Sequence, residues 1–359
     1  MQNKRYRKIA YALTFNFLLC LNLFAQVPDI SNEKRGIVIY PSDITSLGAL
    51  NWVDLLSKNN INLIGIHTDT RLEPLTDLEF FLKSKEGIAF LKACEEHDID
   101  IEYELHALQD LLPRSTFLKP PEYFRLDEQG IRQQEYNMCF TSNPAYDAIE
   151  KNIHKITKWL KPSTHRYSFW TDDVQFAFCH CEGCKPYSVS EQALLYENKL
   201  LGMLRKIDPE AKVAHLAYTN TMASPIKVKP LEGVFLEYAP INRNYDVGLT
   251  EKHLNDLKEN LKVFPKETAH VLEYWLDVSM FSDWKKDNLV KLPWKKENFF
   301  MRDIKVYKSL GINSITTFGA WINNDYIKQY GVDHTNKVLS EYGNTLNTSK
   351  KKDKLLMPA

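Results

Sequence analysis

Acidic side chains follow several short apolar segments of this 359-residue chain. Asp172 and Asp173 directly follow one such segment. Glu237 and Glu273 lie near the ends of two others, each inside a Leu-Glu-Tyr triplet. A carboxylate in apolar surroundings is costly unless it is paired, hydrogen-bonded or used in a reaction. Paired carboxyl groups can cleave a glycosidic bond, because one protonates the departing oxygen while the other attacks or stabilises the cationic sugar or activates water.

The expected roles of these acids follow from their positions at the ends of predicted strands. We expect Asp173 to be the general acid with Asp172 supporting it, because neighbouring strand residues point in opposite directions and only one faces a central cavity. We expect Glu273 or Glu237 to act as nucleophile or base. Asp277 also follows the seventh apolar segment. Any one of these acids could instead cap a helix or pair with an arginine, but the whole set indicates an active site.

Aromatic and polar side chains accompany the acids and are expected to bind the substrate. Flat aromatic faces suit sugar rings, and tyrosine hydroxyls suit their hydroxyl groups. Packing between strands and helices is the alternative role for each tryptophan. The expected substrate-binding residues are Tyr40, His67, Glu104, His106, Trp170, Tyr218, Tyr238, Tyr274, Trp275 and Trp321.

The third predicted strand offers a different chemistry. Glu102, Glu104 and His106 share one parity, so they can point into the same cavity. A metal site on these three residues is possible, although a hydrogen-bonded substrate subsite is the preferred interpretation. A further alternative is a metal-dependent hydrolase that uses His67, Glu104 and His106. We expect no cofactor for the catalytic step itself.

The cysteines form the most specific local motif. Cys179, Cys181 and Cys184 are spaced C-x-C-x-x-C, and Cys139 lies on the long segment before them. Cys94 lies alone in an amphipathic segment, where a small buried side chain is the expected role. Four thiolates are the ligand set of a tetrahedral structural zinc site, whereas an oxidising compartment would favour disulfides among the same residues. Both alternatives fix the segment that follows Asp172 and Asp173.

The first 25 residues are expected to be a signal peptide. Lys4, Arg5, Arg7 and Lys8 precede an apolar stretch that ends at Ala25, which is typical of a secretory leader. Removing this segment leaves a chain with no apolar run long enough to span a bilayer. We therefore expect a periplasmic or secreted protein, with a barrel domain over residues 26–346 and a flexible basic tail over residues 347–359.

Short apolar runs alternate with longer segments of helical periodicity along the rest of the chain. Eight strand–helix units predict a single-domain α/β fold, the (β/α)8 TIM barrel, in which the carboxyl ends of all strands meet at one mouth. Glycine-rich dinucleotide and phosphate-loop motifs are absent from the sequence. The expected strands are 36–40, 62–67, 99–108, 167–171, 212–218, 233–238, 269–276 and 314–318, and the expected helices are 47–58, 78–97, 144–160, 190–207, 251–264, 294–310 and 333–346.

Three motifs follow one another in the middle of the chain: Met-Cys-Phe-Thr-Ser-Asn-Pro at 138–144, Trp170-Thr171-Asp172-Asp173, and the cysteine cluster. In this combination the chain resembles a bacterial secreted family called domain of unknown function 4838. The resemblance runs over about residues 36–345. That family is similar to glycosidase barrels and distantly to the α-glucuronidases of glycoside hydrolase family 67. The resemblance implies an exported (β/α)8 protein that uses carbohydrate. Many retaining glycosidase barrels have Asn-Glu where this chain has Asp-Asp.

The composition bears on the class of partner. Lys and Arg total 46 and Asp and Glu total 46, so net charge recommends neither nucleic acid nor an anionic membrane as partner. Aromatic residues are 12% of the chain, which suits binding of ring-shaped ligands. We expect an exported glycoside hydrolase acting on an oligosaccharide or polysaccharide. The alternative is a non-catalytic glycan-binding barrel, in which the same carboxylates only form hydrogen bonds.

Overall fold

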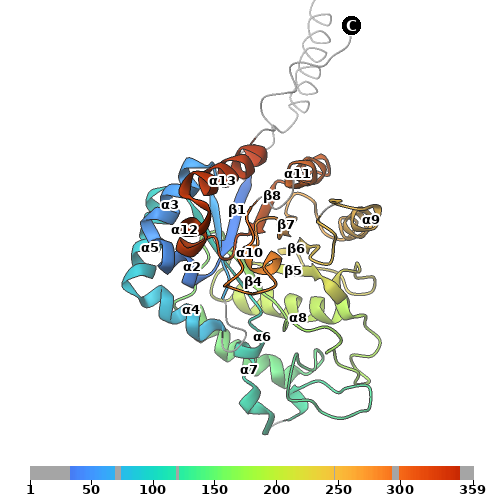
Figure 1. Ribbon diagram of the computed structural model, residues 1–359. Helices are drawn as coiled ribbons and strands as arrows, with labels where there is room; N and C mark the ends of the chain where they lie inside the picture. The colour runs from blue at the N-terminus through green and yellow to red at the C-terminus, as the bar shows by residue number, and fades with distance from the viewer. Residues whose placement is uncertain (1–32, 69–73, 119–120, 246, 293–298, 348–359) are drawn as a thin grey trace, which may run out of the picture. The chain divides into compact units, whose positions relative to one another are not determined.

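The computed structural model describes residues 33–68, 74–118, 121–245, 247–292 and 299–347 (Figure 1). The expected signal peptide and nearly all of the expected basic tail lie outside these residues. The strands are β1 (Lys34–Ile39), β2 (Leu63–Ile66), β3 (Asp100–Leu105), β4 (Arg166–Phe169), β5 (Lys212–Tyr218), β6 (Val234–Ala239), β7 (His270–Glu273) and β8 (Ser314–Phe318).

The eight strands form a closed parallel barrel, which confirms the fold expected from the sequence. Each strand pairs with the next along the chain, and β1 pairs with β8 over Lys34↔Ser314 to Val38↔Phe318. The strands are short and rich in branched apolar residues because both faces of a parallel sheet are covered. In β1, for example, Ile37, Val38 and Ile39 are fully buried.

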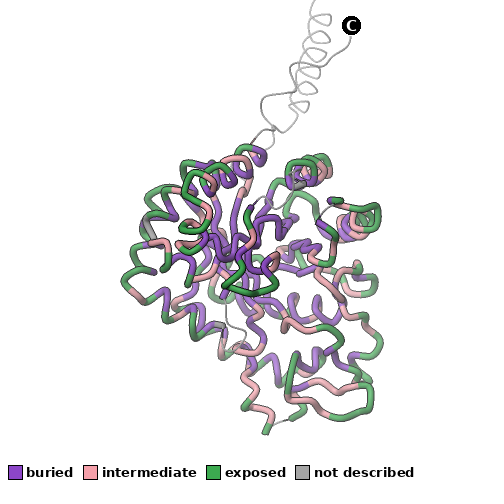
Figure 2. The backbone as a smooth tube through the Cα atoms, viewed as in Figure 1, coloured by how far each residue is buried: buried purple, intermediate pink, exposed green. Residues whose placement is uncertain are grey.

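Helices follow the strands and surround the barrel in Figure 1. In Figure 2 the buried residues are concentrated along the strands and on the helix faces that pack against them. No helix in the described ranges has the length and apolar character needed to cross a membrane. The helices are α2 (Pro41–Leu47), α3 (Ala49–Lys58), α4 (Pro74–Lys83), α5 (Lys85–Glu96), α6 (Leu108–Leu111), η2 (Arg114–Leu118), η3 (Pro121–Tyr123), α7 (Asn143–Ile156), α8 (Val189–Leu204), η4 (Thr219–Thr221), α9 (Glu251–Asn260), α10 (Val278–Phe281), α11 (Phe299–Ser309), α12 (Asn324–Tyr330) and α13 (Val332–Asn347).

One expected helix is divided in two by local capping. The apolar periodicity of residues 78–97 predicts a continuous helix, but α4 ends at Lys83 and α5 begins at Lys85. Ser84 caps α5 by accepting a hydrogen bond from the amide of Gly87. A Cβ atom at Gly87 would lie 2.1 Å from the carbonyl oxygen of Phe81, so only glycine allows this close turn.

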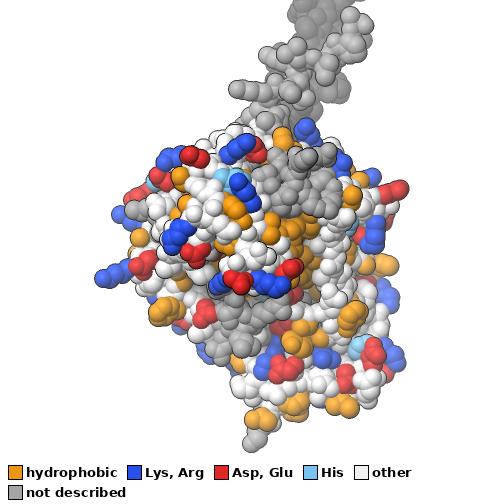
Figure 3. Space-filling view, viewed as in Figure 1, with side chains coloured by type: hydrophobic (Ala, Val, Ile, Leu, Met, Phe, Trp, Pro, Cys, Tyr) orange, Lys and Arg blue, Asp and Glu red, His pale blue; other side chains and the backbone are white. Residues whose placement is uncertain are grey.

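The face of the molecule in Figure 3 shows no dominance of either charge. Lys and Arg side chains are interspersed with Asp and Glu on the face displayed in Figure 3. This distribution agrees with the balanced composition and gives that face no single-sign field for a polyanionic partner.

The interior of the barrel contains a network of charged and polar side chains. Arg166 of β4 donates to Ser314 of β8 at 2.9 Å, and its Nε lies 3.5 Å from Glu102 of β3. His270 of β7 is paired with Ser314 and with Thr316, at 2.8 and 2.9 Å. Each of these groups is shielded from water, so the network must satisfy them internally. It includes the first residues of β4, β7 and β8, so it lies at the end of the barrel away from the mouth.

Candidate functional site

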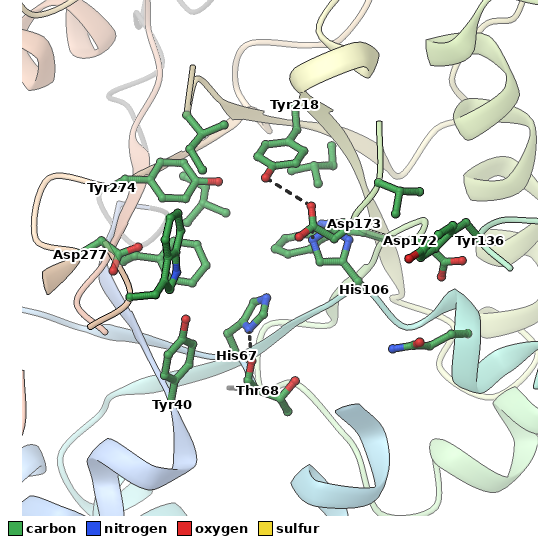
Figure 4. A pocket seen from close by; sticks show the side chains of 18 of the residues that line it. Tyr40, His67, Thr68, His106, Tyr136, Asp172, Asp173, Tyr218, Tyr274 and Asp277 are labelled. Atoms are coloured by element: carbon green, nitrogen blue, oxygen red, sulfur yellow. Dashed lines mark hydrogen bonds and ion pairs between the residues drawn. The ribbon is translucent and has the colours of Figure 1, made fainter. Parts of the chain in front are cut away.

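A pocket of about 400 Å³ opens at the carboxyl ends of the strands. Most of its wall comes from residues at or just after strand ends, as the barrel fold requires of an active site. Aromatic rings alternate with histidines and carboxylates around it (Figure 4). The residues expected from the sequence that line this pocket are Tyr40, His67, His106, Trp170, Asp172, Asp173, Tyr218 and Tyr274.

Asp173 reaches into this pocket from the segment after β4. Its side chain is about one-third exposed (33%). The hydroxyl of Tyr218 donates to its Oδ1 over 3.4 Å, and Nε2 of His106 lies 3.9 Å from the same oxygen. Nδ1 of His106 is 2.6 Å from the carbonyl oxygen of Thr171, so Nδ1 carries a proton and Nε2 is the nitrogen turned toward Asp173. Tyr218 and His106 therefore flank the carboxyl group of Asp173 inside the pocket.

Asp277 lines the same pocket from the segment after β7. Its Oδ1 accepts hydrogen bonds from the hydroxyl of Ser279 and the amide of Met280, at 2.5 and 3.0 Å, at the start of α10. Burial raises the pKa of Asp277 to about 6, although these hydrogen bonds oppose the shift. Figure 4 shows Asp277 and Asp173 on opposite sides of the hollow. The pocket thus has two carboxyl groups facing a shared space.

Asp172 has a different environment from its neighbour. Its Oδ2 accepts hydrogen bonds from Arg114 and from the amide of Asn137. Its own amide donates to the side-chain oxygen of Asn137 at 3.0 Å. Burial raises the pKa of Asp172, and Arg114 opposes that shift. These contacts tie the segment that carries Asp173 to the long excursion after β3, which is a positioning role.

His67 and Tyr40 form another part of the pocket wall. Nδ1 of His67 is 2.6 Å from the carbonyl oxygen of Thr68, which fixes the proton on Nδ1. The His67 ring lies 6.1 Å from Trp170 and 5.9 Å from Tyr40, measured between ring centroids. These rings give the pocket flat faces beside polar ring atoms, an arrangement suited to a sugar ring.

Glu273 does not reach the pocket, contrary to the expectation from the sequence. His270 and Leu272 face the inside of the barrel, so Glu273 points to the outer side. There it accepts from Arg243 at 2.7 Å and from the hydroxyl of Tyr307, and both Glu273 and Arg243 are fully buried. A carboxylate enclosed by a guanidinium under the helix layer cannot contact a ligand in the mouth.

Glu237 and Glu104 point inward but lie below the pocket. Glu237 accepts from the indole of Trp170 at 2.7 Å and from Ser168 at 3.1 Å. Burial raises the pKa of Glu237 to about 7. Burial and the neighbouring Glu237 raise the pKa of Glu104 well above its ordinary value. Neither side chain lines the pocket, so the structure separates them from the ligand space expected for them.

The metal site considered for the third strand is also rearranged. Glu104 comes together with Glu237 and His270, and their ligand atoms all lie within 4.8 Å of one another. His67 and His106 instead belong to the wall of the pocket above. The structure therefore does not bring Glu104 to the two histidines with which the sequence analysis grouped it.

Three expected aromatic platforms have packing roles. The hydroxyl of Tyr238 donates to the carbonyl of His253 at 2.8 Å on the outside of the barrel. Trp275 packs among rings of the outer layer, 6.3 Å from Phe300 between centroids. The backbone amide of Trp321 donates to Asp43 at 3.0 Å. Tyr238, Trp275 and Trp321 are buried and do not belong to the pocket lining, so the structure does not bring these three expected substrate-binding residues to the pocket.

The four cysteines of the motif converge beside the segment that carries Asp172. The sulfur atoms of Cys139, Cys179, Cys181 and Cys184 lie within 4.8 Å of one another, and all four cysteines are free. Cys94 is also free and is buried in α5. This convergence joins the excursion after β3 to the loop after β4.

The sequence of the chain matches one known protein family. Residues 69–330 match the model of a family described as Domain of unknown function (DUF4838). The chain belongs to the DUF4838 family. No curated protein matches the chain in sequence. The DUF4838 match includes Asp173, Asp277 and all four cysteines of the motif, whereas β1, β2 and α13 lie outside it.

Solved structures similar to this DUF4838 chain have the same barrel fold. A β-galactosidase from Rahnella sp. R3 is 12% identical with a TM-score of 0.54, over 89% of this chain and 56% of that chain. A mutant of the O-GlcNAc hydrolase of Thermobaculum terrenum is 11% identical with a TM-score of 0.50, over 88% of this chain and 59% of that chain. The chain thus spans less than two thirds of the length of these proteins.

Several pocket residues of this DUF4838 chain had no role assigned in the sequence analysis. Asp277 was recognised after the seventh strand without a role, and its position as helix N-cap was a further signal. The others come mainly from the excursion after β3, whose unusual length was itself a signal, since long loops at a barrel mouth commonly carry function. These residues are Gln109, Arg114, Glu135, Tyr136 and Trp284.

Proposed function

We propose that this protein is a glycoside hydrolase and that its two catalytic carboxyl groups are Asp173 and Asp277. The observation that carries the proposal is their position on opposite sides of one aromatic-walled pocket at the barrel mouth. Cleavage of a glycosidic bond needs two such groups, one on each side of the bond. The names of the two solved barrels described above, a β-galactosidase and an O-GlcNAc hydrolase, support the same class of reaction.

Asp173 is the proposed proton donor. Its carboxyl group lies beside His106 and accepts a hydrogen bond from Tyr218, and it is accessible enough to contact the oxygen of a departing sugar. When the glycosidic C–O bond breaks, the proton passes from Asp173 to that oxygen, and the bonding electrons leave with it. The hydroxyl of Tyr218, which donates to Oδ1 of Asp173, then stabilises the charge of the new carboxylate.

Asp277 is the proposed second carboxyl group, in place of Glu273 or Glu237. The hydroxyl of Ser279 and the amide of Met280 hold its Oδ1, so they orient the group and favour its charged form. As a carboxylate it acts on the anomeric carbon, as nucleophile or by activating water. A cavity of about 400 Å³ is small for a ligand pocket, so we propose that it receives the terminal sugars of an oligosaccharide.

Export is part of the proposal and rests on the sequence. The basic start and apolar stretch of residues 1–25 support a leader that directs the chain to the periplasm or the medium. Glycans too large to enter a cell are the substrates that such a location supplies. A signal-peptide cleavage site after Ala25, read from the N-terminus of the purified extracellular protein, is the expected result.

The test is a screen of oligosaccharides and aryl glycosides with the wild type, followed by variants on the responsive substrate. Asp173→Asn and Asp277→Asn are each expected to lower kcat/KM by about 10²–10⁴-fold while circular dichroism is unchanged. Asp287→Asn, an exposed acid in the same connection as Asp277, is the matched control and should keep full activity.

The dependence of activity on pH distinguishes the roles of Asp173 and Asp277. Because burial raises the pKa of Asp277 to about 6, activity should rise with pH through about 6 as this group becomes charged. Loss of a falling limb in Asp277→Asn would instead make Asp277 the proton donor. If calorimetry shows that the wild type binds sugars but turns none of them over, the protein is a glycan-binding barrel and not an enzyme.

A further inference from the structure

We propose that Cys139, Cys179, Cys181 and Cys184 bind a structural zinc ion. Their four sulfur atoms lie within 4.8 Å of one another. The sulfur of Cys139 is 3.6 Å from that of Cys181 and 4.0 Å from that of Cys184. A Zn–S bond of about 2.3 Å in a tetrahedron places sulfur atoms about 3.8 Å apart, which agrees with both distances.

The surroundings of the cysteines suit thiolates. Three of the four side chains are buried, and Cys181 is half-buried. The amide of Leu126 donates to the sulfur of Cys179 at 3.4 Å. The hydroxyl of Thr141 lies 3.4 Å from the sulfur of Cys184 and 3.8 Å from that of Cys181. Four thiolates around Zn²⁺ leave two negative charges, and donors directed at the sulfur atoms offset them.

The loop of the motif is fixed in a shape that holds three of these sulfurs together. The side-chain oxygen of Gln192, in α8, accepts from the amide of Cys179 at 3.0 Å, and its nitrogen donates to the Cys179 carbonyl at 3.1 Å. A Cβ atom at Gly183 would lie 2.6 Å from the hydroxyl oxygen of Thr141, so glycine permits the loop to approach Thr141. A loop held in this way presents a preformed site, which lowers the entropy cost of binding an ion.

The proposed ion would also fix the candidate active site. Cys139 lies two residues beyond Asn137, whose backbone and side chain bond to Asp172. Asn137 also donates to the carbonyl of Ala177 at 2.8 Å, on the way to the motif. Zinc would therefore join the excursion after β3 to the segment that carries Asp173. The binding of zinc does not depend on the proposed function, whereas this positioning effect rests on it.

The first experiment measures metal in the full chain purified without chelators. We expect about one zinc ion per chain by mass spectrometry of the elements, and zinc-edge X-ray absorption with four sulfur neighbours at about 2.3 Å. Iron in place of zinc, with visible charge-transfer absorption, would overturn the choice of metal. Disulfides mapped among these four cysteines, in a chain that holds no metal, would overturn the site.

Variants separate the site from the other buried cysteine. Cys139→Ala and Cys181→Ala should each lose bound zinc, whereas Cys94→Ala should keep it. In case a variant does not fold, the wild type is treated with a chromogenic zinc chelator under native conditions, and release of the ion should accompany a lower Tm that added zinc restores. Retention of full Tm after the zinc has left would exclude a structural role.

Failure of this proposal is distinguishable from failure of the proposed function. Zinc content and Tm are measured without any substrate, so they stand even when no glycan is cleaved. Where a substrate is known, zinc removal should lower kcat/KM by at least as much as Asn137→Ala, because both release Asp172. If kcat/KM is unchanged after zinc is removed, the zinc site does not affect the pocket. That result overturns the positioning effect and leaves the zinc site itself standing.

Discussion

The triplets Leu236-Glu237-Tyr238 and Leu272-Glu273-Tyr274 lie on neighbouring strands and have opposite orientations. Glu237 points into the barrel, where it accepts from Trp170. Glu273 points outward and pairs with Arg243. The register explains the difference, because Glu237 pairs with His270, and Glu273 stands three residues after His270 and therefore on the opposite face. The same three residues thus have different neighbours because each strand has its own register.

The comparison also distinguishes two ways of burying a carboxyl group. Burial raises the pKa of both glutamates to about 7. For Glu273 the fully buried Arg243 opposes that rise and provides an ion pair. Glu237 accepts hydrogen bonds from neutral donors and stands near Glu104, another carboxyl group, and the charge of Arg166 opposes the rise of its pKa. We therefore expect the outer glutamate to support the fold as an ion and the inner one to support it in its neutral form.

Loss of the outer glutamate should have the largest effect. Glu273→Ala leaves the guanidinium of Arg243 buried with one partner fewer, and we expect the free energy of unfolding to fall by about 3–5 kcal/mol in denaturant titrations. Glu267→Ala, an exposed residue just before β7, is the matched control and should stay within about 0.5 kcal/mol of wild type. An equally small loss for Glu273→Ala would mean that the ion pair does not form.

The inner glutamate should determine part of the pH dependence of stability. Its pKa of about 7 in the folded chain lies above the ordinary value, so the folded state binds the proton more tightly. The resulting stability is complete below pH 4.5 and is lost as the pH rises through about 7. Glu237→Gln should flatten the fall of Tm between these limits, whereas Glu232→Gln, an exposed residue before β6, should not. A wild-type slope in Glu237→Gln would show that Glu237 is charged throughout.

Removing one hydrogen-bond donor from each glutamate should have the smallest effect on stability. The pair of variants also allows a direct comparison of the two sites. Ser168→Ala removes a donor to Glu237, and Tyr307→Phe removes one from Glu273. We expect each to cost about 1 kcal/mol in chemical unfolding, since both glutamates keep a second partner. A much larger loss for Tyr307→Phe would mean that the hydroxyl, and not Arg243, is the main partner of Glu273.

The barrel and half of the site could be predicted from the sequence. Alternating apolar runs and amphipathic segments predicted eight strands in order, and the rule that strand ends meet at one mouth brought Asp173, His106, Trp170 and Tyr218 together. Orientation could not be predicted in the same way. Both faces of these parallel strands are buried, and both carry polar groups, such as Glu237 inside and Glu273 outside, so the pattern gives no signal of which residues face inward.

The remaining differences from the expected site and helices have several physical causes. Tyr238 stands on the outer side of β6 and Trp275 just after β7, and both are buried. Asp277 lies beyond the end of β7, where the chain turns into α10 and strand parity no longer applies. Gly87 divides an expected helix because of a contact with Phe81, which no local pattern reveals.

Pairing between β1 and β8 has a practical consequence for fragments of this chain. A fragment cut to residues 69–330 lacks β1 and β2, so β3 and β8 would each lose a neighbour. Both would then present unpaired amide and carbonyl groups along an open sheet edge, the usual starting point of strand-to-strand aggregation. Expression of the protein in a folded state therefore requires DNA that encodes at least Lys34 onward, well upstream of the conserved-domain boundary.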